Sequence, residues 1–118
     1  MGEPERDSAH KAPSQDEVDR LMAPYREQID RIDRDIMALL GRRARVIAEV
    51  ADFKRRTGIP GMQRERIERQ IAARRAWAEQ EGLDPYFIAA WFDRLIAHHS
   101  AVEQGQIDAG EPSIREPR

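Results

Sequence analysis

The chain has 118 residues, no cysteine and a net charge of −2, with 20 basic and 22 acidic residues. The absence of cysteine excludes disulfides and thiol chemistry and favours a reducing, cytoplasmic location. A nearly neutral balance without a basic stripe argues against nucleic acid as a partner, and the lack of a long apolar run argues against a membrane. This length allows one domain with a modest core.

The two ends of the chain are polar and lack apolar periodicity. We therefore expect disordered tails over residues 1–13 and 108–118, on either side of a helical domain over residues 14–107. Ser14 and Glu17 have the spacing of a capping box, which predicts a short helical lead-in over residues 15–22.

A very long helix is predicted next, from Pro24 to about Arg56. Pro24 suits a first helical turn, or it kinks the lead-in into the long helix. Some 32 residues would form a rod of about 48 Å, far longer than the usual globular helix. Two shorter helices of the same chain cannot cover it, so a second copy of the chain is expected. The apolar positions recur with helical spacing: Tyr25, Ile29, Ile32, Ile36, Leu39, Leu40, Val46, Ile47, Val50 and Phe53.

The charges on this rod suggest a binding slot. Arg43 and Lys54 are 11 residues apart, so they project from one face about 16 Å apart, with Ile47 between them. Two cations at the ends of an apolar floor suit a small dianion. Arg26 is turned away by about 100° from that face. An antiparallel second copy could deliver Arg26 to the slot.

Two helices of medium length follow. A glycine and proline near residues 58–60 end the long helix, and the second helix is predicted from about Gln63 to Gln80. Asp84 and a proline after it supply an N-cap and a first turn for the third helix, over residues 85–106. No strand pattern is present, so the predicted fold class is all-α.

The residues show no metal-ligand spacing, no nucleophile-base pairing and no glycine-rich phosphate loop. His98 and His99 are adjacent, so on a helix they point about 100° apart and cannot chelate one ion. The remaining chemistry is a cation-rich helical interior, which suits electrostatic catalysis on an anionic substrate.

Five stretches together resemble the all-helical, type II chorismate mutases: YREQIDRID, LLGRRARV, AEVADFK, GIP…RERI and EGLDPYFIAAWFDRLI. The resemblance covers about residues 24–104. It implies an intertwined homodimeric helical bundle with two active sites. It also implies a pericyclic Claisen rearrangement of a small dicarboxylate substrate, with no cofactor and no metal.

The resemblance also implies roles for individual residues. Arg26 matches the arginine that the partner subunit donates to a substrate carboxylate, and Arg43 matches an arginine for the other carboxylate. Lys54 matches the lysine that contacts a carboxylate and the ether oxygen of the breaking bond. Arg66 matches the arginine of the second helix, and Gln63 precedes it in the substrate-binding stretch.

The third helix completes the expected site. Glu103 stands where many members have a glutamine that donates to the ether oxygen, so it must be protonated or be neutralised by Lys54. Gln104 becomes the candidate if that helix is rotated. His99, one turn before Glu103, is expected either to line the pocket or to pack as a half-buried side chain.

The departures from the family bear on the substrate. Most chorismate mutases have a glutamate after the arginine, to accept from the C4 hydroxyl; here Ile67 follows Arg66. Isochorismate pyruvate lyases and 4-amino-4-deoxychorismate mutases also have an aliphatic residue there. The stretch ARRAWAEQEGLD resembles the lyases. The stretch GIPGMQ and the pair Val102-Glu103 resemble the 4-amino-4-deoxychorismate mutases. Glu103 replaces a glutamine that the other branches commonly keep, which favours 4-amino-4-deoxychorismate.

Three functions therefore compete. The chain is expected to be a mutase, acting on chorismate or 4-amino-4-deoxychorismate. The alternative is an isochorismate pyruvate lyase that forms salicylate and pyruvate. An alternative of another class is a non-catalytic helical dimer or regulatory module. Six further arginines are expected to be solvated charges: Arg42, Arg45, Arg55, Arg56, Arg74 and Arg75.

Overall fold

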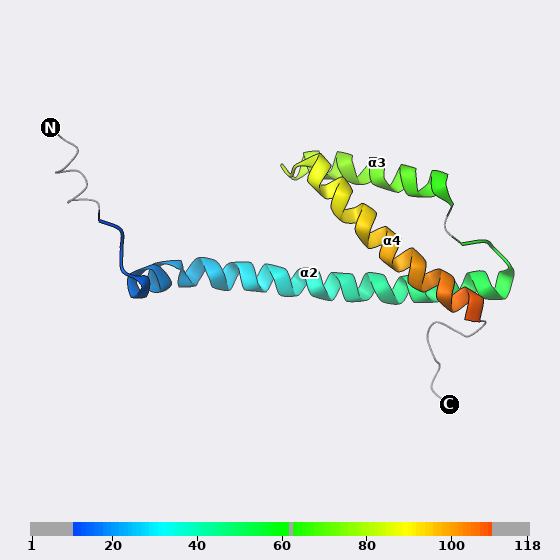
Figure 1. The fold of residues 1–118 in the computed structure, drawn as a ribbon, viewed down its shortest axis with the longest axis horizontal. Coiled ribbons are helices and arrows are strands. Elements are labelled where there is room, and N and C mark those ends of the chain that lie inside the picture. The colour runs from blue at the N-terminus through cyan, green and yellow to red at the C-terminus, as the bar shows by residue number, and fades with distance from the viewer. Residues whose placement is uncertain (1–10, 62, 110–118) are drawn as a thin grey trace, which may run out of the picture. The chain divides into compact units, whose positions relative to one another are not determined.

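The computed structural model describes residues 11–61 and 63–109. Within these ranges the fold is all-α, as predicted. It has a long helix α2 (Gln15–Thr57) and two shorter helices, α3 (Arg64–Gln80) and α4 (Pro85–Ala109) (Figure 1). The chain divides into two compact units, Met1–Leu39 and Leu40–Arg118.

Helix α2 begins earlier than the prediction placed the long helix. The lead-in and the long helix are one element that starts at Gln15, and Pro24 lies inside it. The start has the serine half of the predicted capping box: the Ser14 Oγ accepts from the Glu17 backbone N at 3.2 Å. The Glu17 carboxylate accepts from the Ser14 hydroxyl at 3.2 Å and not from its backbone N–H. This cap supports helix upstream of Pro24, whose ring costs one backbone hydrogen bond without ending the helix.

In the described part of the unit Met1–Leu39, most large apolar side chains of α2 are exposed to solvent. We define its apolar stripe as six residues with helical spacing, and Ile29 and Ile32 within it are 54% and 57% exposed. The whole stripe consists of Leu21, Tyr25, Ile29, Ile32, Ile36 and Leu39. A helix with one exposed apolar face needs a partner surface to be stable in water.

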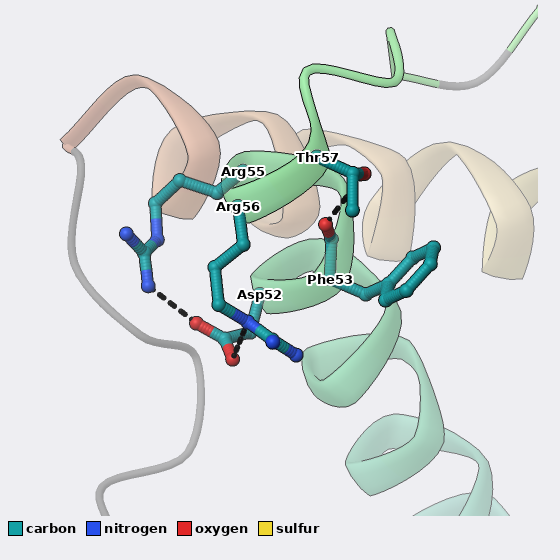
Figure 2. Close-up of polar contacts among 5 residues, drawn as sticks. All are labelled: Asp52, Phe53, Arg55, Arg56 and Thr57. Atoms are coloured by element: carbon teal, nitrogen blue, oxygen red, sulfur yellow. Dashed lines mark hydrogen bonds and ion pairs between the residues drawn. The ribbon is translucent and has the colours of Figure 1, made fainter.

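The last turn of α2 is held by local polar contacts (Figure 2). Asp52 accepts from Arg55 at 2.5 Å and from Arg56 at 3.1 Å, and the Thr57 hydroxyl donates to the Phe53 carbonyl at 2.8 Å. Two guanidinium groups beside it hold the pKa of Asp52 below its usual range, led by the hydrogen bond from Arg55. These contacts fix the turn that carries Lys54.

A left-handed glycine ends α2. Gly58 has a φ of 76°, and its N donates to the Lys54 carbonyl at 2.8 Å. The predicted stop signal is therefore present. A second glycine, Gly61, lies against α4: an added Cβ there would be 2.5 Å from the Gln104 Oε1. The loop approaches α4 closely because Gly61 has no side chain.

Helices α3 and α4 form a tight hairpin (Figure 1). The Leu83 N donates to the Ala78 carbonyl at 2.8 Å across Gly82, and the Asp84 carboxylate caps α4 by accepting from the Tyr86 N at 2.9 Å. Small buried residues, Ala78 and Ala89, lie on the two helices. Small side chains allow two helices to approach closely.

The ends of the domain differ slightly from the prediction. Helix α4 continues to Ala109, three residues beyond the predicted end, so Asp108 and Ala109 belong to it and not to a tail. Residues 11–13 have no regular secondary structure. The rest of the two expected tails, residues 1–10 and 110–118, lies outside the described residues.

Candidate active site

A half-buried pair joins α2 to α4 at Arg43 and His99. The Arg43 Nη1 lies 2.5 Å from the His99 Nδ1. Arginine has only donors, so Nδ1 accepts and the neutral imidazole carries its proton on Nε2. Burial, followed by the positive charges of Arg43 and His98, lowers the pKa of His99, which agrees with a neutral ring. Burial also lowers the pKa of Arg43.

A second pair, Lys54 and Glu103, lies further along the same two helices. The Lys54 Nζ donates to the Glu103 Oε1 at 2.7 Å, and their side chains are 15% and 4% exposed. Glu103 is buried with the apolar residues of the core, at 3% exposure. A buried carboxylate is stabilised by its cationic partner, and it becomes costly if that partner is removed.

Gln104, the alternative to Glu103, points elsewhere. It is exposed, and its Nε2 donates to Asp108 at 2.8 Å, one turn further along α4. The rotation of α4 thus directs Glu103, and not Gln104, toward Lys54. The pairing of Glu103 with Lys54 matches one of the two ways in which the sequence allowed its charge to be neutralised.

Among the described residues, Gln63, Arg66 and Ile67 form no hydrogen bond or ion pair with either of these two pairs. Gln63 precedes α3 with an extended backbone, and Arg66 is exposed. Ile67 is half-buried and lines an open groove between α3 and α4, together with Arg75 and Asp93. The roles of Gln63, Arg66 and Ile67 therefore remain predictions.

Arg26 belongs to the other unit of the chain. Its guanidinium forms an ion pair with Asp19 at 3.0 Å, and both side chains are about half exposed, at 52% and 54%. An exposed pair of this kind contributes little to stability, so Arg26 remains free to exchange Asp19 for another anion.

The sequence interpretation missed two arginines. Arg55 and Arg74 were expected to be solvated, but both are half-buried, and each has a buried Nε without a hydrogen-bond partner. Arg74 follows Arg66 by eight residues, which turns it by about 80° on α3. That angle is small enough to place both on one side of the helix, and it was the available signal for Arg74.

The described residues contain no group of three or more His, Cys, Asp and Glu side chains that could hold a metal ion. No helix in this part of the chain is long and apolar enough to cross a membrane.

The long helix α2 thus presents Arg43 and Lys54 to His99 and Glu103 on α4. The family profile for chorismate mutase type II matches residues 25–104, which is more than half of the chain. The chain belongs to the chorismate mutase type II family, which is a family of enzymes.

Two curated proteins are similar to this chain in sequence. The chain is 39% identical to an isochorismate pyruvate lyase of Pseudomonas aeruginosa over 84 residues, which cover 70% of this chain and 80% of the lyase. It is 40% identical to a T-protein of Enterobacter agglomerans over 75 residues, 64% of this chain but 20% of that protein. No solved structure gave a significant match.

Proposed function

We propose that the protein catalyses a cofactor-free Claisen rearrangement of a chorismate-type dicarboxylate, with 4-amino-4-deoxychorismate as the favoured substrate. The observation that carries the proposal is the pair of contacts Arg43–His99 and Lys54–Glu103, which direct two cations of α2 toward α4. A dianion between these helices would meet a cation at each end, and its reacting bond would lie near Lys54.

The chemistry needs no covalent step from the protein. In the rearrangement the ether C–O bond breaks while a new C–C bond forms within the same molecule, and breaking leads forming. Negative charge therefore develops on the ether oxygen. A preorganised ammonium such as that of Lys54, in a site with little water, stabilises that charge more in the transition state than in the ground state. The walls of the slot hold the reactive conformer.

Glu103 has a supporting part in this proposal. In the free protein its Oε1 accepts a hydrogen bond from the Lys54 ammonium at 2.7 Å and so fixes the position of the catalytic charge. An ionised carboxylate would repel the charge that develops on the ether oxygen. Glu103 must therefore remain paired with Lys54 during the reaction, or take up a proton and donate it in a hydrogen bond.

Ile67 argues against a C4 hydroxyl on the substrate, and Glu103, in place of the usual glutamine, favours the 4-amino substrate. The family glutamate that would accept from a C4 hydroxyl is replaced here by an aliphatic side chain. An isoleucine offers no acceptor to a hydroxyl, so a C4 hydroxyl gains nothing at this position. The missing acceptor therefore disfavours chorismate.

We further propose that the active unit is a homodimer in which Arg26 of a second copy completes the site. The support is the exposed apolar stripe of α2, which one chain leaves in solvent, and the weak pairing of Arg26 with Asp19. Closing two stripes against each other in a twofold dimer would bury both, because a twofold interface uses the same patch on each copy.

A second candidate function is isochorismate pyruvate lyase, favoured by the 39% identity to the Pseudomonas enzyme of that name. The lyase reaction would break the equivalent ether bond, while a ring hydrogen moves to the departing enolpyruvyl carbon to give salicylate and pyruvate. Lys54 would stabilise the same oxygen in both reactions. The two candidates therefore share one cation set and differ in how the substrate is held.

Incubation of the purified protein with chorismate, 4-amino-4-deoxychorismate and isochorismate in turn tests the proposal. We expect conversion of the amino substrate to 4-amino-4-deoxyprephenate, with a higher kcat/KM than for chorismate. Salicylate with an equal amount of pyruvate from isochorismate would establish the lyase instead. No turnover of any of the three would support the non-catalytic alternative. The variant Ile67→Glu provides a matched test, since it should shift preference toward chorismate.

A further inference from the structure

Arg74 on α3 is set apart from the other arginines by its surroundings. Its guanidinium carbon lies 4.9 Å from the centre of the Trp77 ring and 5.2 Å from that of Phe92 on α4. Its Nη1 donates to the Gln70 carbonyl at 3.1 Å, and its Nε is buried without a partner. Two aromatic faces and one carbonyl hold the guanidinium in a fixed position without neutralising its charge.

The charged groups that act most on Arg74 are two other arginines. Arg74 packs on Phe92, which lies about two turns before His99 on the same face of α4, and His99 contacts Arg43. Burial, followed by the charges of Arg43 and Arg66, lowers the pKa of Arg74, as expected for a guanidinium near these two cations. None of the three forms an ion pair with an acidic side chain among the described residues. Arg43 and Arg74 are half-buried and Arg66 is exposed. Their like charges repel at Arg74, and a bound anion would relieve the repulsion.

The spacing along α3 also places Arg74 near Arg66. Relative to Arg66, Gln70 is turned by about 40° and Arg74 by about 80°, so these three polar residues lie on one side of α3, which they share with Trp77 at about 20°. Ile67 follows at about 100° and Ile71 at about 140°, where the apolar arc begins. Arg74 thus lies on the same side of α3 as Arg66, next to the apolar side. Arg75, one residue later, is turned away to about 180°.

We propose that Arg74 is a further substrate-binding residue, whose guanidinium meets a carboxylate of the dianionic substrate beside Arg43 and Arg66. This inference rests on the proposed function for the identity of the dianion. The carboxylates keep their charge throughout a pericyclic reaction. A cation that faces them binds ground state and transition state equally, which changes KM and leaves kcat nearly constant. Lys54, by contrast, should act on kcat.

The test compares Arg74→Met with the control Arg75→Met. Methionine keeps an unbranched side chain between the two aromatic rings but removes the charge, and Arg75 is an exposed neighbour whose guanidinium lies 6.0 Å from the Tyr86 ring centre. We expect Arg74→Met to raise KM by about 10- to 100-fold, the range for hydrogen bonds to charged groups, with kcat within a few fold. Arg75→Met should change neither.

Two further measurements separate binding from packing. Arg74→Lys keeps the charge without the planar group, so it should recover part of the lost affinity. When the ionic strength rises from about 0.01 to 1 M, the screening length falls from about 30 to 3 Å, and KM of the wild type should rise more than KM of Arg74→Met. A structural role would give a lower melting temperature, an equal salt response and no recovery with lysine, which would overturn the proposal.

Calorimetric titration with chorismate distinguishes this inference from the proposed function. If the wild type turns over none of the three substrates, the proposed function fails, yet the chorismate dianion can still be tested for binding. Weaker binding by Arg74→Met than by Arg75→Met would keep Arg74 as an anion ligand. Equal binding by these two variants, or no binding by the wild type, would retire it.

Discussion

The two units of the chain use the same kind of helix in opposite ways. In Met1–Leu39 the apolar stripe is exposed, with Ile32 at 57%, and Arg26 forms an exposed ion pair with Asp19. In Leu40–Arg118 small and apolar residues are buried, such as Ala78 and Ile96 at 2% each, and a glutamate is buried with them at 3%. The first unit resembles one half of an interface, and the second resembles a core built around polar pairs. Charged substitutions should therefore cause opposite failures: loss of association in the first unit and loss of chemistry in the second.

The largest expected effect is in the second unit, at Lys54. Lys54→Ala should reduce kcat by about 10²–10³-fold or more, because it removes the charge that meets the developing oxyanion. It should also lower the melting temperature, because Glu103 at 3% exposure loses its partner. Lys54→Arg should fail as well, since a planar guanidinium does not replace a point ammonium.

The double variant Lys54→Ala with Glu103→Gln separates the loss of turnover from the loss of stability. It removes the unpaired carboxylate, so thermal unfolding should recover toward the wild type while turnover stays absent. Steady-state kinetics and a thermal melt on the same samples are sufficient. Near-normal turnover in either variant would exclude Lys54 from the chemistry.

The next effect is in the first unit, at Ile32. Ile32→Asp places a charge in the middle of the apolar stripe. Each copy in a dimer would lose the burial of one side chain, about 1.5–3 kcal/mol, and would gain a carboxylate to desolvate, so association should weaken by about 100-fold or more. Sedimentation over a concentration series measures this.

The control is Arg34→Asp, which lies two residues further and about 200° around the helix, away from the stripe. It should leave association unchanged. A wild type that is a folded, active monomer at micromolar concentration would contradict the assignment of the stripe to an interface.

A smaller effect is expected for the charge of Glu103. Glu103→Gln keeps an acceptor for Lys54 and adds an amide donor that does not depend on pH. If Glu103 must carry a proton in the complex, wild-type activity should fall as the pH rises, and the variant should show a flat alkaline limb. Identical pH profiles for the two proteins would show that Glu103 acts through Lys54 alone.

The smallest expected effect is the acid sensitivity of His99. Its pKa is lowered from the ordinary 6.5, chiefly by burial and then by Arg43 and His98, so the unfolded chain binds more protons than the folded one at acidic pH. Stability is therefore fully present above 6.5 and falls as the pH drops through 6.5 toward the lower folded-state pKa. Denaturant melts of wild type and His99→Gln should converge in acid if His99 is the cause, whereas His98→Gln should keep the acid loss.

Much of the fold could be predicted from the sequence because its signals are local. Ser14 and Asp84 cap the starts of helices α2 and α4. Gly58 and Gly82 follow the ends of α2 and α3, and both have a positive φ. The predicted helix start at Pro24 was wrong, because the cap at Ser14, ten residues upstream, starts the helix and α2 continues through the proline.

The site was less predictable, for tertiary reasons. Arg43, Lys54, His99 and Glu103 were selected by spacing and family resemblance, and their pairing across α2 and α4 depends on how α4 is rotated. Arg74 and Arg75 are identical in type and adjacent in sequence, so composition cannot tell which one is buried. The distinction arises from the aromatic ring of Phe92 on another helix.

The comparison between the two units leads to one decisive measurement: mixing two inactive proteins, Arg26→Ala and Lys54→Ala, and assaying turnover after subunit exchange. Each variant alone has a lesion in every site. If Arg26 acts across a dimer, a mixed dimer has one site with neither lesion and one with both, so random exchange should restore up to about a quarter of wild-type activity. Sedimentation of the mixture verifies that exchange has occurred. No recovery after verified exchange would contradict the claim that the second unit of one copy is completed by the first unit of another.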